Sequence, residues 1–198
     1  MKSREGTVVD ADDLIYQMTN KAKNICESSG KLEFISKEKK NNLFKIIALG
    51  ALKYYILKVD PKKRILFDPE ASIDFNGNTG PFIQYTYARI KTLINNTEEN
   101  TLSIDEDLQI QDKEKELIKH LGRYPEIIFL AGKQYSPAIV ANYLYDLVKS
   151  YNSFYQNINI LKTNNLKLRN FRISLSEKVA EVIKNSALLL GIEVPSRM

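Results

Sequence analysis

The sequence predicts an all-α protein in which a helical bundle follows a mainly helical N-terminal part. Apolar residues recur at three- and four-residue spacing over several long stretches, as on the buried face of a helix. Residues that start or end helices flank these stretches. No segment repeats at a fixed period, which argues against a solenoid, and a hydrophobic content of 43% is enough for a packed core.

Two long helices are expected in the N-terminal part. Asp10 is a suitable N-cap for a helix through Leu14 and Met18. Ser36 is a suitable N-cap for a second helix, which should continue until Asp60-Pro61. The helix should stop there because the residue before a proline is disfavoured in the helical conformation.

A short extended region is expected between these helices and the bundle. Residues 65–67 and 72–75 are rich in β-branched and aromatic residues, and Asp68-Pro69 reads as a turn between them. We therefore expect two short strands here.

Five helices are expected from about residue 80 onward. The first runs over residues 82–93, the second passes through Leu117 and Leu121, and a short third covers residues 127–131. The clearest amphipathic pattern follows Ser136-Pro137, a favourable helix start, and comprises Ile139, Val140, Tyr143, Leu144, Leu147, Val148 and Tyr151. The last helix carries Leu175, Val179, Val182, Ile183 and Leu190, and Gly191 should cap its C-terminal end.

The run from Asp74 to Arg89 joins a polar, glycine-containing loop to an aromatic and basic helix start. Gly77 and Gly80 can take positive φ and allow another backbone to come close, while Pro81 fits the first turn of a helix. The remaining loop residues have short side chains that hydrogen-bond locally, namely Asn76, Asn78 and Thr79.

Phe82, Tyr85 and Arg89 follow at positions i, i+3 and i+7, so they share one stripe of that helix. Aromatic rings and an arginine plane are the groups on which unstacked RNA bases stack. The same spacing also suits a helix whose aromatic residues belong to the core.

Charge is unevenly distributed along the chain, although the net charge is only +5. Residues 31–64 carry ten basic and three acidic residues, a local charge of +7, whereas residues 98–116 carry eight acidic and two basic residues, a local charge of −6. The basic part is either a solvated surface or a source of salt-sensitive affinity for RNA phosphates. The same two interpretations apply to a second basic cluster, formed by Lys162, Lys167, Arg169 and Arg172.

The sequence offers few residues for catalysis. His120 is the only histidine and is expected at a solvated helix end, and Cys26 is the only cysteine and is expected to be a small buried residue. A zinc cluster and an intrachain disulfide are therefore excluded. No apolar run approaches the roughly 20 residues of a membrane span and no signal-peptide pattern opens the chain, so we expect a cytoplasmic location.

Four separated blocks resemble arginyl-tRNA synthetases, in the order in which that family has them. Residues 78–85 with Ala88-Arg89 resemble the segment that leads into the family's anticodon-binding domain. Residues 141–147 with residues 151–155 resemble the central helix of that domain, and residues 188–198 resemble its C-terminus. Residues 1–14 resemble the ATP-handling signature loop of class I synthetases and the helix after it. Together the blocks cover almost the whole chain, which makes the resemblance specific.

The resemblance implies the C-terminal piece of an arginyl-tRNA synthetase, built of two parts. Residues 1–75 correspond to the end of the catalytic domain, with the signature loop and the stem-contact helices. Residues 76–198 correspond to an anticodon-binding helical bundle of the DALR type. Lys2, Ser3 and Arg4 correspond to the signature loop, whose cations face the phosphates of ATP. The nucleotide-binding half of the enzyme is missing from these 198 residues. We therefore expect no aminoacylation and no bound cofactor in this chain alone; ATP with magnesium, and arginine, belong to the full-length ligase.

The resemblance also implies RNA-binding residues and a partner. The loop from Asp74 to Thr79 would shape the backbone of the anticodon loop, through Asn76, Gly77, Asn78 and Thr79. Phe82, Tyr85 and Arg89 would stack on or contact its bases, and Met198 would pack against them. Many family members carry tyrosine where this chain has Phe82, which keeps stacking but loses a hydroxyl. The expected partner is arginine tRNA, bound by a monomer that does not associate with membranes.

Some of five further bundle residues are expected to contact the RNA and the others to belong to the core. They are Tyr143, Tyr145, Asn152, Phe154 and Tyr155. Two other functions stay open at this point. One is a helical module, derived from a synthetase, that binds a protein partner and has no RNA role. The other is a small free-standing enzyme, for which the sequence offers no set of catalytic residues.

Overall fold

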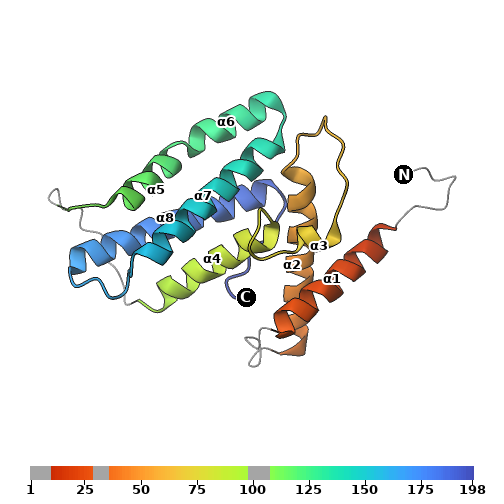
Figure 1. The fold of residues 1–198 in the computed structure, drawn as a ribbon, viewed down its shortest axis with the longest axis horizontal. Coiled ribbons are helices and arrows are strands. Elements are labelled where there is room, and N and C mark those ends of the chain that lie inside the picture. The colour runs from red at the N-terminus through yellow and green to blue at the C-terminus, as the bar shows by residue number, and fades with distance from the viewer. Residues whose placement is uncertain (1–9, 29–35, 98–107) are drawn as a thin grey trace.

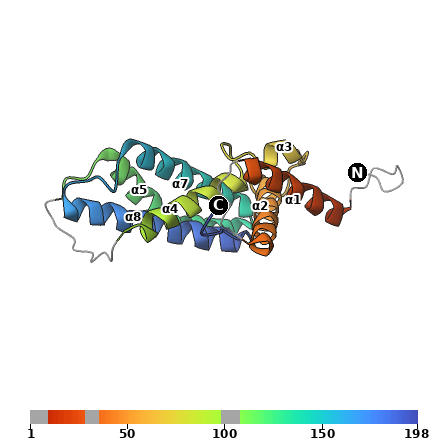
Figure 2. The same cartoon turned by 90° about the horizontal axis from the view of Figure 1, so that it is seen from below.

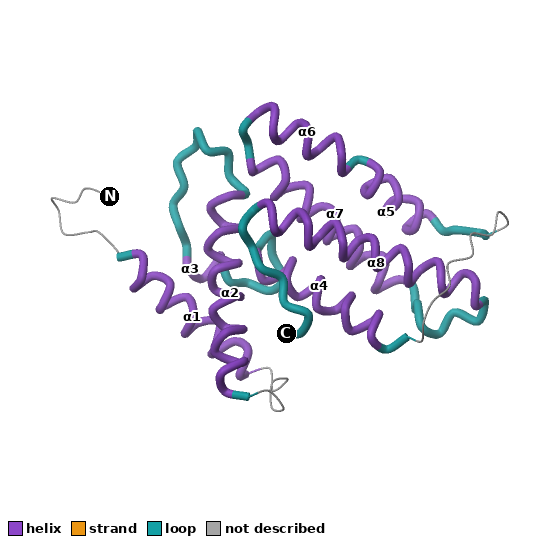
Figure 3. The backbone as a smooth tube through the Cα atoms, turned by 180° about the vertical axis from the view of Figure 1, so that it is seen from behind, coloured by secondary structure: helices purple, strands orange, loops and turns teal. Residues whose placement is uncertain are grey.

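The computed structural model describes residues 10–28, 36–97 and 108–198, and this part of the chain forms eight α-helices and no strand. The all-α prediction is confirmed. Figure 1 and Figure 3 show the order of the helices from opposite sides. They are α1 (Ala11–Ser28), α2 (Lys37–Leu57), α3 (Pro69–Ser72), α4 (Gly80–Asn95), α5 (Asp112–Gly122), α6 (Tyr124–Gln134), α7 (Pro137–Asn157) and α8 (Leu166–Leu189).

The two predicted short strands are wrong. Residues 65–67 have no regular structure, and the predicted turn is the start of the short helix α3. Asp68 is its N-cap, because its Oδ1 atom accepts hydrogen bonds from the backbone N–H groups of Glu70 at 2.9 Å and Ala71 at 3.1 Å. Proline in the first turn supports the helix as well. Asp-Pro therefore acts here as a helix start and not as a hairpin turn.

A bundle of the five helices α4 to α8 forms the larger part of the described structure. α4 packs against α8, α7 packs against α8, and α5 and α6 both pack against α7. α5 and α6 follow one another along one edge, α4 forms the opposite edge, and α7 and α8 lie between them (Figure 1, Figure 3). The core is built from the apolar stripe that the sequence predicts for α7, including the fully buried Leu144, Leu147 and Tyr151.

α1, α2 and α3 gather at one end of the elongated molecule (Figure 2). A second hydrophobic cluster lies there, in which Met18 and Cys26 of α1 meet Phe44 and Ile47 of α2. The predicted burial of Cys26 is confirmed. Tyr54, also on α2, belongs instead to the core of the bundle, so α2 contributes to both clusters.

α2 and α4 come close enough for their backbones to touch. A Cβ atom on Gly80 would lie 2.3 Å from the carbonyl oxygen of Gly50, so only glycine fits at Gly80. The side-chain amide of Gln84 donates hydrogen bonds to the carbonyls of Ile46, at 3.1 Å, and Glu193, at 2.8 Å. One buried side chain thus ties together α2, α4 and the C-terminal tail. Gly80 serves close approach and not positive φ, which among the described glycines only Gly191 adopts.

α8 ends as the sequence predicts. Gly191 has a φ of 65°, and the N–H groups of Gly191 and Ile192 bond the carbonyls of Leu188, at 2.9 Å, and Ala187, at 2.8 Å. This is the Schellman arrangement, which needs a left-handed residue after the helix. The turn directs the tail back toward α2 and α4, beside which the C-terminus lies (Figure 1, Figure 2).

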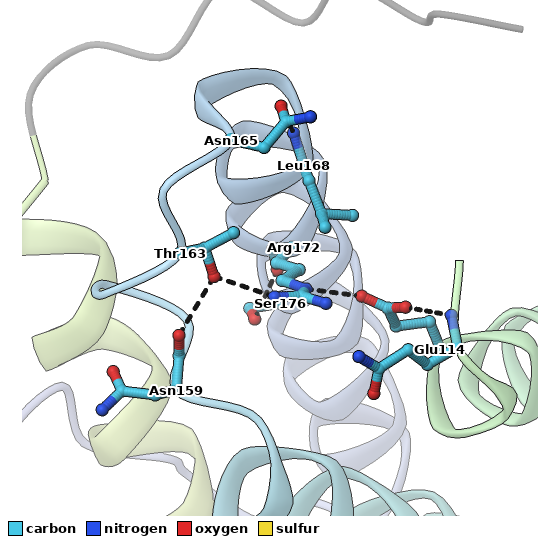
Figure 4. A network of polar contacts seen from close by, with 8 residues as sticks. Glu114, Asn159, Thr163, Asn165, Leu168, Arg172 and Ser176 are labelled. Carbon is cyan, nitrogen blue, oxygen red and sulfur yellow. Dashed lines mark hydrogen bonds and ion pairs between the residues drawn. The ribbon is translucent and has the colours of Figure 1, made fainter. Parts of the chain in front are cut away.

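A buried ion pair joins α5 to α8 (Figure 4). Arg172 Nε donates to Glu114 Oε1 at 2.6 Å, and the side chains are only 6% and 0% exposed. The same guanidinium donates to Thr163 Oγ1 at 2.8 Å, and the other carboxylate oxygen of Glu114 accepts from the backbone N–H of Gln111. Arg172 therefore faces the interior, and the interpretation of its cluster as a phosphate-binding surface is wrong for this residue.

Candidate nucleic-acid interface

The predicted stripe on α4 is partly exposed, as an RNA-binding stripe requires. Phe82, Tyr85 and Arg89 are each half-buried, whereas the helix residues between and beside them are buried. The buried ones form the contact of α4 with the rest of the bundle. The three stripe residues consequently share a face of this helix that reaches solvent.

The guanidinium of Arg89 is held between two tyrosine rings. Its Cζ atom lies 4.9 Å from the ring centroid of Tyr85 and 5.2 Å from that of Tyr155. Arg89 Nη1 also donates to Asn152 Oδ1. Asn152 is fixed in turn, because its Nδ2 atom donates to Thr86 Oγ1 at 2.8 Å and to the carbonyl of Val148 at 3.1 Å. The cation is therefore oriented before any ligand arrives.

Further aromatic rings extend this surface in both directions. The ring of Phe75, in the loop before α4, meets that of Tyr85 edge-on at a centroid distance of 6.5 Å. The ring of Phe82 lies 6.1 Å from that of Tyr145. All four residues are half-buried, so part of each is accessible to solvent. Sequence reasoning assigned Phe75 to a strand and missed it as a site residue, because it lies before the helix whose spacing was the signal.

The five bundle residues expected to include contacts and core separate clearly. Tyr143 and Phe154 are 6% and 0% exposed and belong to the core. Tyr145 and Tyr155 are half-buried and lie beside the stripe, while Asn152 is buried and positions Arg89. The separation follows from three-dimensional packing, which spacing within one helix does not reveal.

The loop before α4 is anchored to α2. Asn78 Oδ1 accepts from the hydroxyl of Tyr54 at 2.7 Å, and the Asn78 carbonyl accepts from Lys58 Nζ at 2.8 Å. Thr79 is the N-cap of α4: its hydroxyl donates to the Asp74 carbonyl and accepts from the N–H of Phe82 at 3.3 Å. Thr79 is only 4% exposed, so its side chain shapes the loop.

Asn76 is exposed and Gly77 is half-buried, so this part of the loop is the part open to a ligand. The backbone N–H of Asn76 donates to Asp74 Oδ1 at 2.8 Å, which fixes the turn. Met198 is half-buried against the α1–α2 cluster, as Phe75 is. The tail therefore ends against the same cluster that supports Phe75, and Phe75 in turn contacts Tyr85.

Basic side chains follow the C-terminal end of α2, and one of them, Lys58, reaches the loop before α4. Lys58 lies over the ring of Tyr55, with Nζ 4.7 Å from the ring centroid, and partial burial lowers its pKa. Lys62, Lys63 and Arg64 are exposed. Lys2, Ser3 and Arg4 lie outside the described residues.

The only histidine of the sequence lies in the described part of the chain. His120 is half-buried; its carbonyl accepts from the Tyr143 hydroxyl at 3.0 Å, while its Nδ1 atom is buried without a partner. Within this part of the chain no three acidic, histidine or cysteine side chains are grouped as metal ligands. None of the helices described combines the length and hydropathy needed to cross a bilayer.

A family model, sequence relatives and solved structures all match this chain to related proteins. The family described as "DALR anticodon binding domain" matches residues 83–198. Among relatives, the arginine–tRNA ligase of Flavobacterium psychrophilum is 56% identical over 198 residues, and that of Parabacteroides distasonis is 54% identical over 202 residues. Both alignments cover all of this chain but only 33% and 34% of the relatives.

Two solved structures share the fold. The arginyl-tRNA synthetase of Thermus thermophilus superposes with a TM-score of 0.88 at 27% identity, covering 96% of this chain and 32% of that one. The Plasmodium falciparum enzyme gives a TM-score of 0.83 at 25% identity, covering 96% and 34%. This chain spans about a third of the length of the proteins it matches. It belongs to the DALR anticodon-binding domain family, as the C-terminal part of an arginyl-tRNA synthetase.

Proposed function

We infer that this chain binds the anticodon loop of an arginine tRNA. The observation that carries the inference is the half-exposed face of α4, on which Arg89 is stacked between Tyr85 and Tyr155 in a domain of the anticodon-binding family. Aromatic faces and an oriented guanidinium supply stacking for bases taken out of their own stack. A prepositioned cation binds at a lower entropic cost than a free one.

Each predicted RNA-binding residue has a role in this proposal. Tyr85, Arg89 and Phe82 contact bases, and Asn76 with Gly77 faces the RNA backbone. Asn78 and Thr79 act indirectly, since hydrogen bonds to α2 and α4 already engage them. Met198 supports the surface from the side of the α1–α2 cluster.

In the complete ligase the chain would serve the ATP-dependent charging of tRNA with arginine. Residues 1–75 would then continue the catalytic part, with Lys2, Ser3 and Arg4 facing ATP, and residues 76–198 would form the anticodon-binding part. A cytoplasmic, monomeric enzyme belongs to the same proposal. The nucleotide-binding half would come from the two thirds of the relatives that this chain does not match.

The test is a titration of the chain with arginine tRNA and with the same transcript carrying a replaced anticodon. Tighter binding of the cognate transcript is expected, because base contacts and not phosphate contacts distinguish the two RNAs. Equal affinity for both transcripts would refute the anticodon assignment.

One observation favours a second candidate function, a protein-interaction module. α6 exposes Phe129, at 71%, and is followed by Tyr135, at 90%. Exposed aromatic residues are typical of protein interfaces. Binding measured at two salt concentrations distinguishes the two functions, because phosphate-driven affinity falls steeply with salt concentration and the affinity of an apolar interface does not.

A further inference from the structure

A small pocket of about 210 Å³ lies where the end of α4 meets the end of α7 and the connection from α7 to α8. α4 contributes Leu93, α7 contributes Tyr155 and Gln156, and the connection contributes residues 158–161. Figure 1 and Figure 3 show this connection beside the C-terminal end of α4. The volume is below the roughly 300–1,000 Å³ of pockets for drug-sized ligands, so the pocket suits a single small ring system.

The pocket continues the candidate interface, because the two share a residue. Tyr155 lines the pocket and also lies against Arg89, whose Cζ atom is 5.2 Å from the centroid of the tyrosine ring. Leu93 follows Arg89 by one turn of α4 and therefore lies on the same stripe of that helix. An RNA loop that places one base on Arg89 thus brings a neighbouring nucleotide next to the pocket.

The pocket has a buried apolar floor and exposed amide groups, and its lining is neutral. Leu93, Ile158 and Ile160 are only 5%, 6% and 3% exposed, whereas Gln156 and Asn159 are exposed. No lysine, arginine, aspartate or glutamate lines the pocket in the described part of the chain. A phosphate would lose hydration there without gaining a counter-charge. The lining therefore suits a neutral, flat body with a polar edge, which is the chemistry of a nucleobase.

Two amides are available to bond the edge of such a base. Asn159 Oδ1 accepts from the backbone N–H of Lys162 at 3.2 Å, which holds this amide in place while its Nδ2 atom can donate. The Gln156 amide takes part in no hydrogen bond between described residues, so it can serve as donor and as acceptor. A carboxamide presents a donor beside an acceptor, as the edge of an unpaired base does.

We propose that this pocket binds one unstacked base of the arginine tRNA, next to the bases that α4 contacts, with Tyr155 and Leu93 against the ring and Gln156 bonded to its edge. The proposal rests on the proposed function and adds a base-specific pocket to a stacking surface. Stacking alone tolerates any base, whereas hydrogen bonds to the base edge distinguish one base from another. The pocket should therefore create a preference at one nucleotide of the loop.

The test uses arginine tRNA in which each nucleotide of the anticodon loop is replaced in turn by an abasic residue. Gln156→Met should weaken binding of the intact tRNA about three- to tenfold, the effect of losing one hydrogen bond. It should have no effect on the one abasic tRNA that lacks the base held in the pocket, because the two changes then remove the same contact. The matched control is Gln134→Met, at an exposed glutamine that ends α6, and it should weaken none of these complexes.

A fluorescent reporter detects occupation of the pocket independently of affinity. The chain contains no tryptophan, so Leu161→Trp places a single indole at the mouth of the pocket, where Leu161 is 43% exposed. Intact tRNA should change the emission of this indole, and the abasic tRNA identified with Gln156→Met should not. Leu166→Trp is the control, because Leu166 is exposed at the start of α8 and does not line the pocket, and its signal should be the same with every abasic tRNA.

Wild-type affinity of Gln156→Met for the intact tRNA would overturn the pocket, as would an equal loss of affinity for every abasic tRNA. The anticodon assignment fails through a different result, which is equal affinity of the wild-type chain for the cognate transcript and the transcript with a replaced anticodon.

Discussion

Arg89 shows how a surface residue becomes a binding residue through its neighbours. Its charge is stacked on two rings and bonded to a buried amide, so the side chain has lost most of its rotamer freedom before a ligand binds. An arginine in this state differs from the exposed lysines of the chain, which must be ordered on binding.

Tyr85→Ala and Arg89→Ala should each weaken the complex with arginine tRNA by about 1–3 kcal/mol, the typical contribution of one stacked base. Fluorescence anisotropy with labelled tRNA measures the loss. Phe129→Ala is the matched control, because it removes an exposed ring from α6, on the opposite edge of the bundle. Wild-type affinity in both α4 variants would contradict their assigned roles, provided that circular dichroism shows them folded.

At this scale the sequence predicts which residues share a stripe and not what they touch. The spacing of Phe82, Tyr85 and Arg89 fixes their common face on α4, and the structure confirms it. The stacking of Arg89 on Tyr155 joins residues 66 positions apart, and no local pattern encodes such a contact. The prediction of a phosphate-binding role for Arg172 was wrong for the same reason, since its partner Glu114 lies on another helix.

Alanine substitutions at two helix glycines should change stability in opposite directions, because only one of these glycines touches another backbone. Gly80→Ala should destabilise the protein by about 1–3 kcal/mol, because the new Cβ atom would meet the backbone of Gly50 at 2.3 Å. Gly132→Ala should stabilise it by roughly 0.5–1 kcal/mol, since nothing lies within 4 Å of the new atom and alanine favours the helix. Urea unfolding followed by circular dichroism measures both. A Gly80→Ala variant as stable as the wild type would contradict the backbone contact between α2 and α4.

Removing one partner of the buried Arg172–Glu114 pair should destabilise the protein much more than replacing both partners with apolar residues does. Arg172→Met or Glu114→Leu alone should each cost about 3–5 kcal/mol, because a buried charge loses its partner. The double variant should cost much less than the sum, as both charges are then gone. The exposed Lys178–Glu181 pair offers the control, and Lys178→Ala should leave the urea midpoint unchanged. Additive losses in the double variant would show that the pair is not coupled.

Helices were predicted well and the connection between α2 and α4 was not. Long amphipathic stretches with capping residues locate α1, α2, α4, α7 and α8, and the structure confirms each. The connection has too few residues for periodicity to decide, so β-branched composition suggested strands. The helix α3 forms instead, with Asp68 Oδ1 accepting hydrogen bonds from the backbone N–H groups of Glu70 and Ala71.

For the whole molecule, we expect alkaline pH to lower the free energy of unfolding. Burial, with a smaller effect of Glu27, raises the pKa of the Cys26 thiol from 9.0 to about 11, and burial raises that of Tyr143 from 10.0 to about 12. The unfolded chain therefore loses these protons at lower pH than the folded chain does, and unfolding becomes more favourable as pH rises above about 9.

Cys26→Ala isolates the first of these groups. Between about pH 8 and pH 10 the free energy of unfolding of the wild type should fall by about 1 kcal/mol more than that of the variant, because only the wild type carries the thiol. Urea titrations at the two pH values give the difference. The same fall in both proteins would show that Cys26 does not contribute.

The double hydrogen bond of Gln84 has a consequence for synthesis on the ribosome. Its two acceptors lie 38 positions before it and 109 positions after it in the chain. α2 and α4 are therefore synthesised long before Glu193. During that interval the side-chain amide of Gln84 lacks its second acceptor, and the neighbouring apolar residues are not yet covered by the tail. The nascent protein should thus be most vulnerable to aggregation and to chaperone capture until Glu193 has emerged.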